Sequence, residues 1–281
     1  MKAALLGLPE AGKSTLFTLL TGRAVPPSRK ETEALEGKAP VRDERVDVMN
    51  NLVKPKRKKY AETEFVLCPD VSAGSPKREW LEYARKCDLL CVVVRAFLAP
   101  SVYHPDGSVS PERDKEHLAM ELLLADLEIT DKRLERIEKE KRNGQTPAQA
   151  LEETSLLKCK KALEKEQALL NAGLDENETA VLRHLEFVTL KPVVWVWNVD
   201  DKDVREDAAN PITIACQIEK EIMELQDISE RQAYLKDLGL TSSGVDRMNR
   251  AVYDTLGLMS FYTIGEDEVR AWTVRKGSLA P

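Results

Sequence analysis

The feature that most constrains the fold of this chain is a glycine-rich segment near its start. Residues 7–15 read GLPEAGKST and directly follow the apolar run MKAALL. A short apolar run bounded by glycine is typical of a strand buried on both faces of a parallel sheet. The residues that follow, 13–21, have the pattern of a helix. The segment therefore joins a predicted strand to a predicted helix, which is the setting of a phosphate-binding loop.

The segment matches GxxxxGK[ST], and each residue type in this motif has a chemical role. The glycines let successive backbone N–H groups turn inward around a β-phosphate, and the positive end of the following helix adds to the attraction. Lys13 is expected to reach the β- and γ-phosphates as the catalytic residue, and the Ser14 hydroxyl is expected to bind Mg²⁺. The predicted phosphate-binding residues are Gly7, Pro9, Ala11, Gly12, Lys13, Ser14 and Thr15.

Two points remain open at this loop. The alternative interpretation is a glycine-rich turn that merely joins a strand to a helix. Glu10 is also unexpected, because a carboxylate inside an anion-binding loop repels phosphate unless it points to solvent.

Short apolar runs and helical patterns alternate along the chain. The predicted strands are KAALLGL, TEFVLCPD, DLLCVVVRAF, KPVVWVWNVD and NPITIACQI, and the predicted helices cover 13–21, 76–87, 177–189 and 219–238. This alternation predicts a doubly wound α/β domain with a mostly parallel sheet, in which ligands bind at the carboxyl ends of the strands.

Two segments break the alternation. From about residue 111 to 173, two charged helical patterns follow each other around the breaker NGQTP, which predicts an antiparallel helical coiled-coil arm. After Gly257, two β patterns flank GEDE and suggest the start of a small β domain. We therefore predict a nucleotide-binding domain at 1–110 and 176–257, a helical insertion at 111–175, and an incomplete β domain at 258–281.

Composition argues against several classes of function. The formal net charge of −6 over 281 residues argues against a nucleic-acid coat, and no DNA partner is expected. The basic run KPKRKKY could touch phosphate, but a solvated face is favoured. Scattered cysteines and histidines predict no metal site of their own. The sequence shows no signal segment and no apolar run near the roughly 18 residues of a membrane span, so we expect a cytoplasmic protein without a membrane partner.

A second candidate box lies at the end of the predicted strand KPVVWVWNVD. Asn198, Val199 and Asp201 form an Asn-x-x-Asp box, in which the carboxylate would accept two hydrogen bonds from guanine and the asparagine would tie its loop to the phosphate loop. A helix N-cap is an equally good explanation of this short pattern. The next strand ends at Ala215, Cys216 and Gln217, whose backbone would contact the base.

Several segments together resemble the YchF-type (Obg-like ATPase) subfamily of translation-factor-related P-loop GTPases. They are GLPEAGKSTLFTLLTG, PVRDERVD, LLLADLEITDKRLER, KPVVWVWNVDD, QIEKEI and LGLTSSGVDRMNRAVYDTLGLMSFYTIGEDEVRAWTVRKGSLAP. The resemblance runs over nearly the whole chain. It implies a nucleotide-binding domain interrupted by a coiled-coil arm, a small β-grasp domain of the TGS type, and association with the ribosome or its RNA.

The chain departs from the family pattern at its switch and metal positions. Asp70 is kept from the Asp-x-x-Gly switch motif, but Ala73 stands at the glycine position and the segment after it is shorter. The threonine that senses Mg²⁺ in the family falls on Thr32, in poorly matched surroundings. The resemblance implies Mg²⁺ ligands at Ser14, Thr32 and Asp70.

Two further departures concern the nucleotide. The family's phosphate loop has Asn-Val where this chain has Glu10 and Ala11, and its base box ends in glutamate where this chain has Asp201. Members of the family accept ATP as well as GTP, so both are expected to bind.

The sequence thus predicts Mg²⁺-dependent binding of GTP or ATP with slow hydrolysis. One alternative is a non-catalytic scaffold that nucleotide stabilises and that acts through its helical arm. A P-loop kinase for small molecules is a third interpretation, but it leaves Asn198 and Asp201 unexplained.

Overall fold

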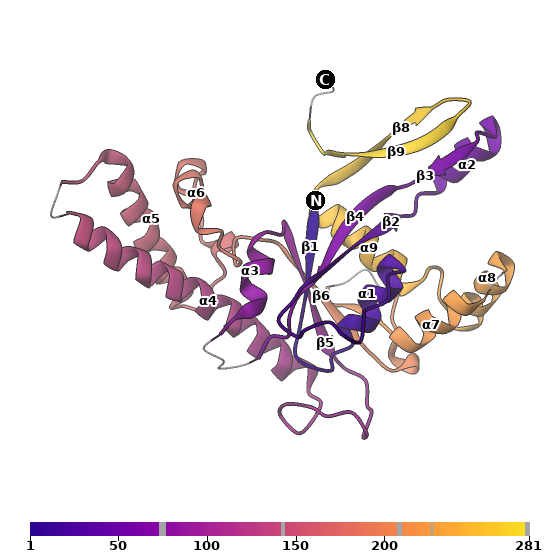
Figure 1. The fold of residues 1–281 in the computed structure, drawn as a ribbon, viewed down its shortest axis with the longest axis horizontal. Helices are drawn as coiled ribbons and strands as arrows, with labels where there is room; N and C mark the ends of the chain where they lie inside the picture. Colours follow the sequence, from indigo (N-terminus) through magenta and orange to yellow (C-terminus); the bar gives the residue numbers. More distant parts are fainter. Residues whose placement is uncertain (73–76, 142–143, 207–209, 226, 279–281) are drawn as a thin grey trace.

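The computed structural model of the chain describes residues 1–72, 77–141, 144–206, 210–225 and 227–278. Its centre is a six-stranded sheet in the order β2-β4-β1-β5-β6-β7 (Figure 1). The strands are β1 (Lys2–Leu6), β2 (Leu35–Val41), β4 (Ala61–Leu67), β5 (Leu89–Arg95), β6 (Val193–Asn198) and β7 (Ile212–Ile214). All neighbours run parallel except β2, which is antiparallel to β4. The mostly parallel sheet predicted from the sequence is confirmed.

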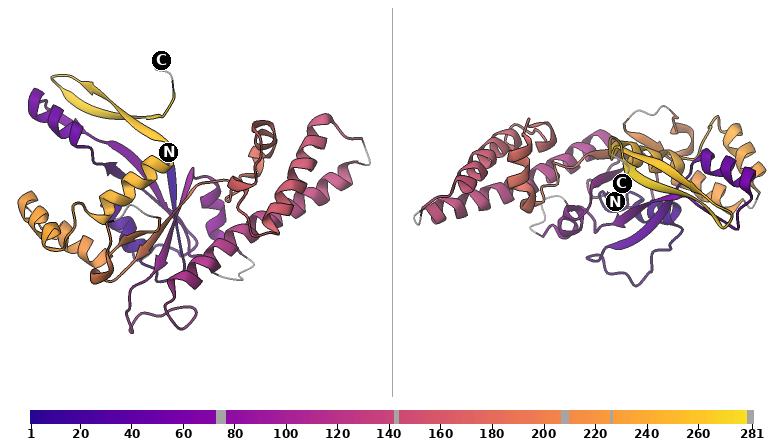
Figure 2. Two further views of the ribbon diagram at one scale, coloured as in Figure 1. Left: turned by 180° about the vertical axis from the view of Figure 1, so that it is seen from behind. Right: turned by 90° about the horizontal axis from the view of Figure 1, so that it is seen from above.

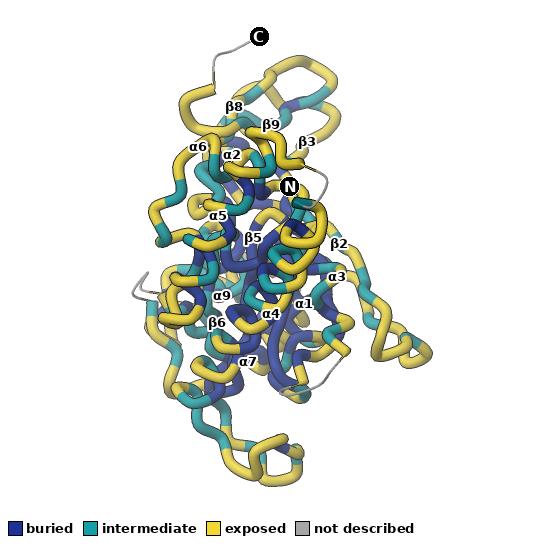
Figure 3. The backbone as a smooth tube through the Cα atoms, turned by 90° about the vertical axis from the view of Figure 1, so that its left-hand side faces the viewer, coloured by how far each residue is buried: buried dark blue, intermediate teal, exposed yellow. Residues whose placement is uncertain are grey.

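Helices cover both faces of this sheet. Helices α1 (Lys13–Thr21) and α9 (Gly244–Thr255) pack on one face, and α3 (Glu79–Arg85) and the first half of α4 (Pro111–Glu140) pack on the other. The middle strands are consequently buried on both sides, as the dark blue centre of Figure 3 shows. This two-sided burial explains why β1 and β5 read as continuous apolar runs.

The helical arm is an antiparallel pair formed by α4 and α5 (Pro147–Leu163), which projects away from the sheet (Figures 1 and 2). Helix α5 begins with a capping box between Thr146 and Gln149. Ion pairs join the two helices, including Arg133 with Glu152 at 2.7 Å. The chain returns through η2 (Leu169–Asn171), α6 (Glu176–Leu182) and η3 (Arg183–Leu185).

The root of the arm belongs to the sheet's own core. Leu118, Leu122 and Ala125 of α4 are buried in the same apolar cluster as Trp80 and the strands β1 and β5. The predicted domain boundaries at residues 110, 175 and 257 stay a prediction.

A second, three-stranded sheet has the order β3-β9-β8. Strands β8 (Leu258–Ile264) and β9 (Glu268–Arg275) form the antiparallel hairpin suggested by the two β patterns around GEDE. Strand β3 (Arg57–Lys59) pairs parallel to β9 and comes from the basic run KPKRKKY. The sequence favours a solvated face for that run, and its exposed lysines agree with this, although the backbone of Arg57–Lys59 is paired in a sheet.

Other elements differ from the prediction in detail. The helix expected at 219–238 is divided into α7 (Cys216–Glu224) and α8 (Ile228–Asp237). The helix expected at 76–87 is described as α3 over Glu79–Arg85, and residue 76 lies outside the described residues. The sequence predicts neither strand β2 nor helix α2 (Glu44–Val53). For β2 the reason is that it is an edge strand whose sequence, LEGKAPV, lacks an apolar run. In the part of the chain that the structure describes, no helix is long and apolar enough to span a membrane.

Candidate nucleotide-binding site

The phosphate loop lies between β1 and α1, at the carboxyl edge of the sheet. A Cβ atom on Gly7 would lie 2.3 Å from the carbonyl oxygen of Val93, and one on Gly12 would lie 2.2 Å from Nδ2 of Asn198. Gly12 also has a left-handed φ of 93°. Both positions therefore require glycine, because the loop packs directly against the ends of β5 and β6.

The remaining predicted phosphate residues run from the loop into the first turn of α1. Pro9 lines an open cleft, and Ala11 is buried in the core beneath the loop. Ser14 is exposed and Thr15 half-buried in the first turn of α1. Backbone N–H groups at the start of a helix carry partial positive charge, which favours an anion at this end of α1.

Lys13 is the buried cation of the site, with 5% of its surface exposed. Its Nζ atom donates to the carbonyl of Leu8 at 2.5 Å and pairs with Oδ1 of Asp70 at 2.7 Å. Burial lowers the pKa of Lys13, while the charges of Asp70 and Glu10 oppose that shift. The structure thus brings together the lysine of the phosphate loop and the carboxylate that the sequence singled out after β4.

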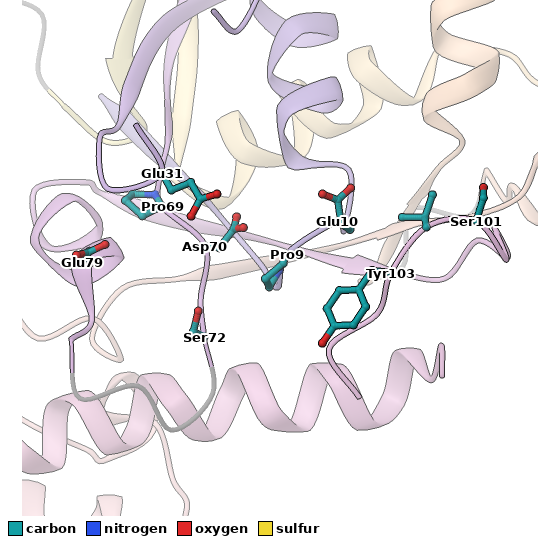
Figure 4. A pocket seen from close by; sticks show the side chains of 10 residues that line it. Pro9, Glu10, Glu31, Pro69, Asp70, Ser72, Glu79, Ser101 and Tyr103 are labelled. Atoms are coloured by element: carbon teal, nitrogen blue, oxygen red, sulfur yellow. The ribbon is translucent and has the colours of Figure 1, made fainter. Parts of the chain in front are cut away.

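A cleft of about 600 Å³ opens beside this pair (Figure 4). Its walls come from the phosphate loop and from the segments that follow α1, β4 and β5, and it is lined by Pro9, Glu10, Glu31, Pro69, Asp70, Ser72, Glu79, Ser101, Val102 and Tyr103. Four of these residues carry carboxylates. Such a cleft repels a bare triphosphate but suits a triphosphate complexed with a divalent cation.

The residues present fit Mg²⁺ in part. Carboxylate and hydroxyl oxygens are the ligands that this ion takes together with phosphate oxygens, and Asp70 and Ser14 offer one of each beside Lys13. Thr32 is exposed, and its carbonyl accepts a hydrogen bond from the Tyr83 hydroxyl at 3.3 Å. Within the described residues, no hydrogen bond joins Thr32 to the phosphate loop, so its role stays a prediction. Ala73 lies outside the described residues.

Asn198 connects the phosphate loop to the predicted base-binding side. Its Nδ2 atom donates to the carbonyl of Ala11 at 3.2 Å, and its Oδ1 atom accepts from the backbone N–H of Cys216 at 3.3 Å. The side chain is 5% exposed. Cys216 is the first residue of α7, so Asn198 joins the start of that helix to the phosphate loop. The predicted tie between Asn198 and the phosphate loop is therefore found, whereas the N-cap of the short helix at Asp201–Asp203 is Asp200, whose side chain makes no capping hydrogen bond.

The other predicted base-side residues follow the ends of β6 and β7. Val199 is buried against Ala215, and Asp201 is exposed at the start of η4 (Asp201–Asp203). Gln217 is exposed on α7, where its Nε2 atom donates to Glu221 at 3.3 Å. Their contact with a base stays a prediction.

Arg95 is the most prominent site residue that sequence reasoning missed. It ends β5 directly beside Asn198, is 3% exposed, and donates to the carbonyls of Phe97, Ala99, Val102 and Tyr103. These bonds fold the loop that carries one wall of the cleft. The available signal was a charged residue at the end of an otherwise apolar strand.

The same loop is fixed at its far end by a buried histidine. His104 accepts the backbone N–H of Asp106 at Nδ1 (3.2 Å), so its Nε2–H donates to Asp114 at 2.9 Å. Asp114 also pairs with Arg113 at 2.8 Å. Although the ring atoms and the carboxylates of Asp106 and Asp114 lie within metal-binding range of each other, both ring nitrogens of His104 are already engaged.

Glu10 gives a prediction about charge in the cleft. It is exposed, with a left-handed φ of 58°, and its side chain faces the same space as Asp70 (Figure 4). We expect Glu10→Gln to tighten triphosphate binding by about fivefold, close to 1 kcal/mol, the scale of one Coulomb interaction between neighbouring charges in water.

Titration calorimetry at low and high salt checks this expectation, with Glu138→Gln on the arm as a control of equal charge change. The gain should be larger without Mg²⁺ and smaller at high salt. Equal gains in both variants would show that only net charge matters.

No protein-family model matches the chain. Among curated proteins, the Ribosome-binding ATPase YchF of Bacillus subtilis (strain 168) is 33% identical over 305 residues, covering 100% of this chain and 83% of the relative. The protein of the same name from Escherichia coli O157:H7 is 34% identical over 301 residues, covering 100% and 82%. The solved structure of the Schizosaccharomyces pombe YchF GTPase superposes with a TM-score of 0.83 at 28% identity, covering 100% of this chain and 82% of that one. The resemblance inferred from the sequence is confirmed: the chain belongs to the YchF family.

Proposed function

We propose that this protein binds a purine nucleoside triphosphate with Mg²⁺, hydrolyses it slowly, and associates with the ribosome. The observation that carries the proposal is the bridge made by Asn198, which joins the phosphate loop at Ala11 to the start of α7 at Cys216. This bridge joins the loops that follow β1, β6 and β7 at one edge of the sheet, and it supports a nucleotide whose phosphates lie at the phosphate loop and whose base lies toward Asp201 and Ala215.

The chain's own residues act by position and charge. The N–H groups of the loop and the Nζ atom of Lys13 hold the phosphates, and Lys13 exchanges its present partners, Leu8 and Asp70, for phosphate oxygens. Asp70 and Ser14 hold the metal, with Thr32 as a further candidate ligand. When bound, Mg²⁺ neutralises charge on the β- and γ-phosphates. The buried core beneath Ala11 keeps the loop rigid.

Both purine nucleotides are expected to bind. Asp201 carries the carboxylate that pairs with the N1–H and N2–H₂ donors of guanine, whereas the curated relatives are named ATPases and the solved relative a GTPase. We expect a modest preference for GTP of roughly tenfold, or about 1.4 kcal/mol.

The test is direct. The protein is titrated with GTP and ATP in the presence of Mg²⁺, and phosphate release is followed over hours with protein in excess. Binding with slow release supports the proposal, and binding without release would favour a nucleotide-stabilised scaffold. No binding of either nucleotide would overturn the proposed function.

The helical arm is our candidate for the ribosome contact, which would give the protein a cytoplasmic location. Deleting residues 134–157 with a short glycine linker removes the outer turns of α4 and α5 but keeps the Asp131–Lys160 ion pair and the root of the arm. Because the outer arm is remote from the cleft, nucleotide affinity should stay within about twofold.

Co-sedimentation with purified ribosomes measures whether the truncated protein still associates with them. We expect the truncated protein to lose most of its association with ribosomes while the parent pellets with them. If the truncated protein pellets as well as the parent, the ribosome contact lies elsewhere.

A further inference from the structure

The segment between α1 and β2 brings a second cation to the phosphate end of the site. Arg29 in this segment is half-buried, and its Nε atom donates to the carbonyl of Glu33 at 2.8 Å. Its Nη2 atom lies 3.4 Å from the carbonyl oxygens of both Leu67 and Cys68. The guanidinium group therefore lies over the carboxyl end of β4, two residues before Asp70.

A chain of contacts connects Arg29 to the phosphate loop. Asp70 follows Cys68 and Pro69 and forms the ion pair with Lys13, whose Nζ atom in turn bonds to the loop at Leu8. The charge of Arg29 acts on Lys13 directly, since it adds to the effect of burial in lowering the pKa of Lys13. Glu31, two residues after Arg29, lines the cleft (Figure 4). The segment thus belongs to the wall of the phosphate site.

The contacts of the Arg29 guanidinium group with the end of β4 are weak. Its two bonds to the end of β4 are long for N–H···O contacts, whose usual distance is about 2.9 Å, and they go to carbonyl oxygens rather than to a carboxylate. A planar guanidinium group matches two phosphate oxygens better than it matches single carbonyls. The charge that grows on a transferring phosphoryl group would therefore draw Arg29 away from these carbonyls.

We propose that Arg29 is an arginine finger supplied by the chain itself. This inference rests on the proposed hydrolysis. In that step a water oxygen attacks the γ-phosphorus, and the bond to the β–γ bridging oxygen breaks. The bond electrons go to the β-phosphate, and nucleoside diphosphate, inorganic phosphate and a proton leave. Arg29 contacts the transferring phosphoryl group and offsets the charge that grows on its oxygens in the transition state.

The neighbouring basic residues do not have this geometry. Arg23 is exposed and its Nη1 atom donates to the carbonyl of Glu36 at 2.5 Å, near the middle of β2. Lys30 is exposed and pairs with Glu33 at 3.4 Å. Of the three basic side chains on this segment, Arg29 alone has contacts that point to the phosphate site.

The role predicts a specific pattern of rates. A switch protein with its arginine in cis hydrolyses at about 10⁻² s⁻¹, compared with about 10⁻⁴ s⁻¹ for one that lacks it. We therefore expect single-turnover phosphate release by the parent near the higher value. Arg29→Gln should slow it about 100-fold while changing the Kd of a non-hydrolysable triphosphate analogue by less than about threefold.

Arg29→Lys and Arg23→Gln complete the set. Lysine keeps the positive charge but lacks the planar pair of N–H donors of a guanidinium group. The hydrolysis rate of Arg29→Lys should therefore fall between those of the parent and Arg29→Gln, whereas Arg23→Gln should hydrolyse at the parent's rate. If Arg29 only braced the end of β4, glutamine and lysine would behave alike, since both can donate to carbonyl oxygens. A second readout is the complex of nucleoside diphosphate with aluminium fluoride, which mimics the transferring phosphoryl group and should be lost in Arg29→Gln while diphosphate binding remains.

The outcomes separate this inference from the proposed function. Equal rates for the parent and Arg29→Gln, or a rate loss matched by an equal loss of analogue affinity, would overturn the role of Arg29 and leave nucleotide hydrolysis standing. A parent protein that binds nucleotide but releases no phosphate would overturn both.

Discussion

Replacing Lys13 with methionine should weaken binding of a Mg²⁺–triphosphate by about 100-fold or more. Methionine keeps most of the buried volume at this position, so the change removes charge with little loss of packing. A hydrogen bond between a charged donor and phosphate contributes about 1.5–3 kcal/mol. Neutralisation is lost as well, and it matters more here than in an ordinary phosphate loop, because four carboxylates line the adjacent cleft.

Titration calorimetry with a non-hydrolysable analogue measures the effect. Lys30→Met is the matched control, since it removes the same charge from an exposed side chain that pairs with Glu33. Thermal unfolding of both variants shows whether the fold is kept. If Lys13→Met binds the analogue as tightly as the control does, the phosphate-loop assignment is wrong.

Features that depend on neighbouring residues could be predicted from the sequence. The strand–loop–helix unit around the phosphate loop is one example, and α1 has the predicted bounds, Lys13–Thr21. Each of the five predicted strands is found in the six-stranded sheet. The signal is clearest in β1 and β5, because burial on both faces leaves a continuous apolar run in the sequence. The meeting of Asn198 with the phosphate loop was also predictable, since it follows from the order of parallel strands.

Features that depend on distant pairings could not be predicted in this way. Strand β3 is stabilised by pairing with β9, which lies about two hundred residues later in the chain. The sequence KPKRKKY contains no pattern that predicts this partner. Strand β2 is an edge strand with glycine and proline, so its pairing with β4 leaves no apolar pattern. The role of Arg95 depends on carbonyl groups of a loop that folds back over it. Such contacts depend on the tertiary path of the backbone, which the local sequence pattern does not specify.

The second large effect concerns stability, at Asp126 in α4. This side chain is fully buried, and its carboxylate accepts hydrogen bonds from the backbone N–H groups of Val188 (3.1 Å) and Thr189 (2.7 Å) and from the Thr189 hydroxyl (2.6 Å). These bonds hold the chain that returns from the arm against α4, just before β6. Asp126→Ala would leave three buried donors unpaired, each at a cost of about 1–3 kcal/mol, so we expect the free energy of unfolding to fall by at least about 3 kcal/mol.

Urea denaturation measures this loss, and Asp131→Ala is the matched control on the same helix. Asp131 is partly exposed and pairs with Lys160 at 2.8 Å, so its removal should cost less than about 1 kcal/mol. Hydrogen exchange should show the loss of protection concentrated at Val188 and Thr189. Equal destabilisation by the two substitutions would mean that the buried carboxylate does not organise the return of the arm.

The pH dependence of this effect follows from the same burial. Burial raises the pKa of Asp126 to about 6, although the three donors oppose the shift. The unfolded value is about 3.9, so between these two values the native state binds the extra proton, and the stability that this carboxyl contributes falls as the pH rises. The difference in unfolding free energy between the parent and Asp126→Asn should therefore shrink from about pH 4 to about pH 6 and level off above pH 7. A difference that grows over this range would mean that the hydrogen bonds outweigh burial and that the carboxyl is ionised in the native state throughout.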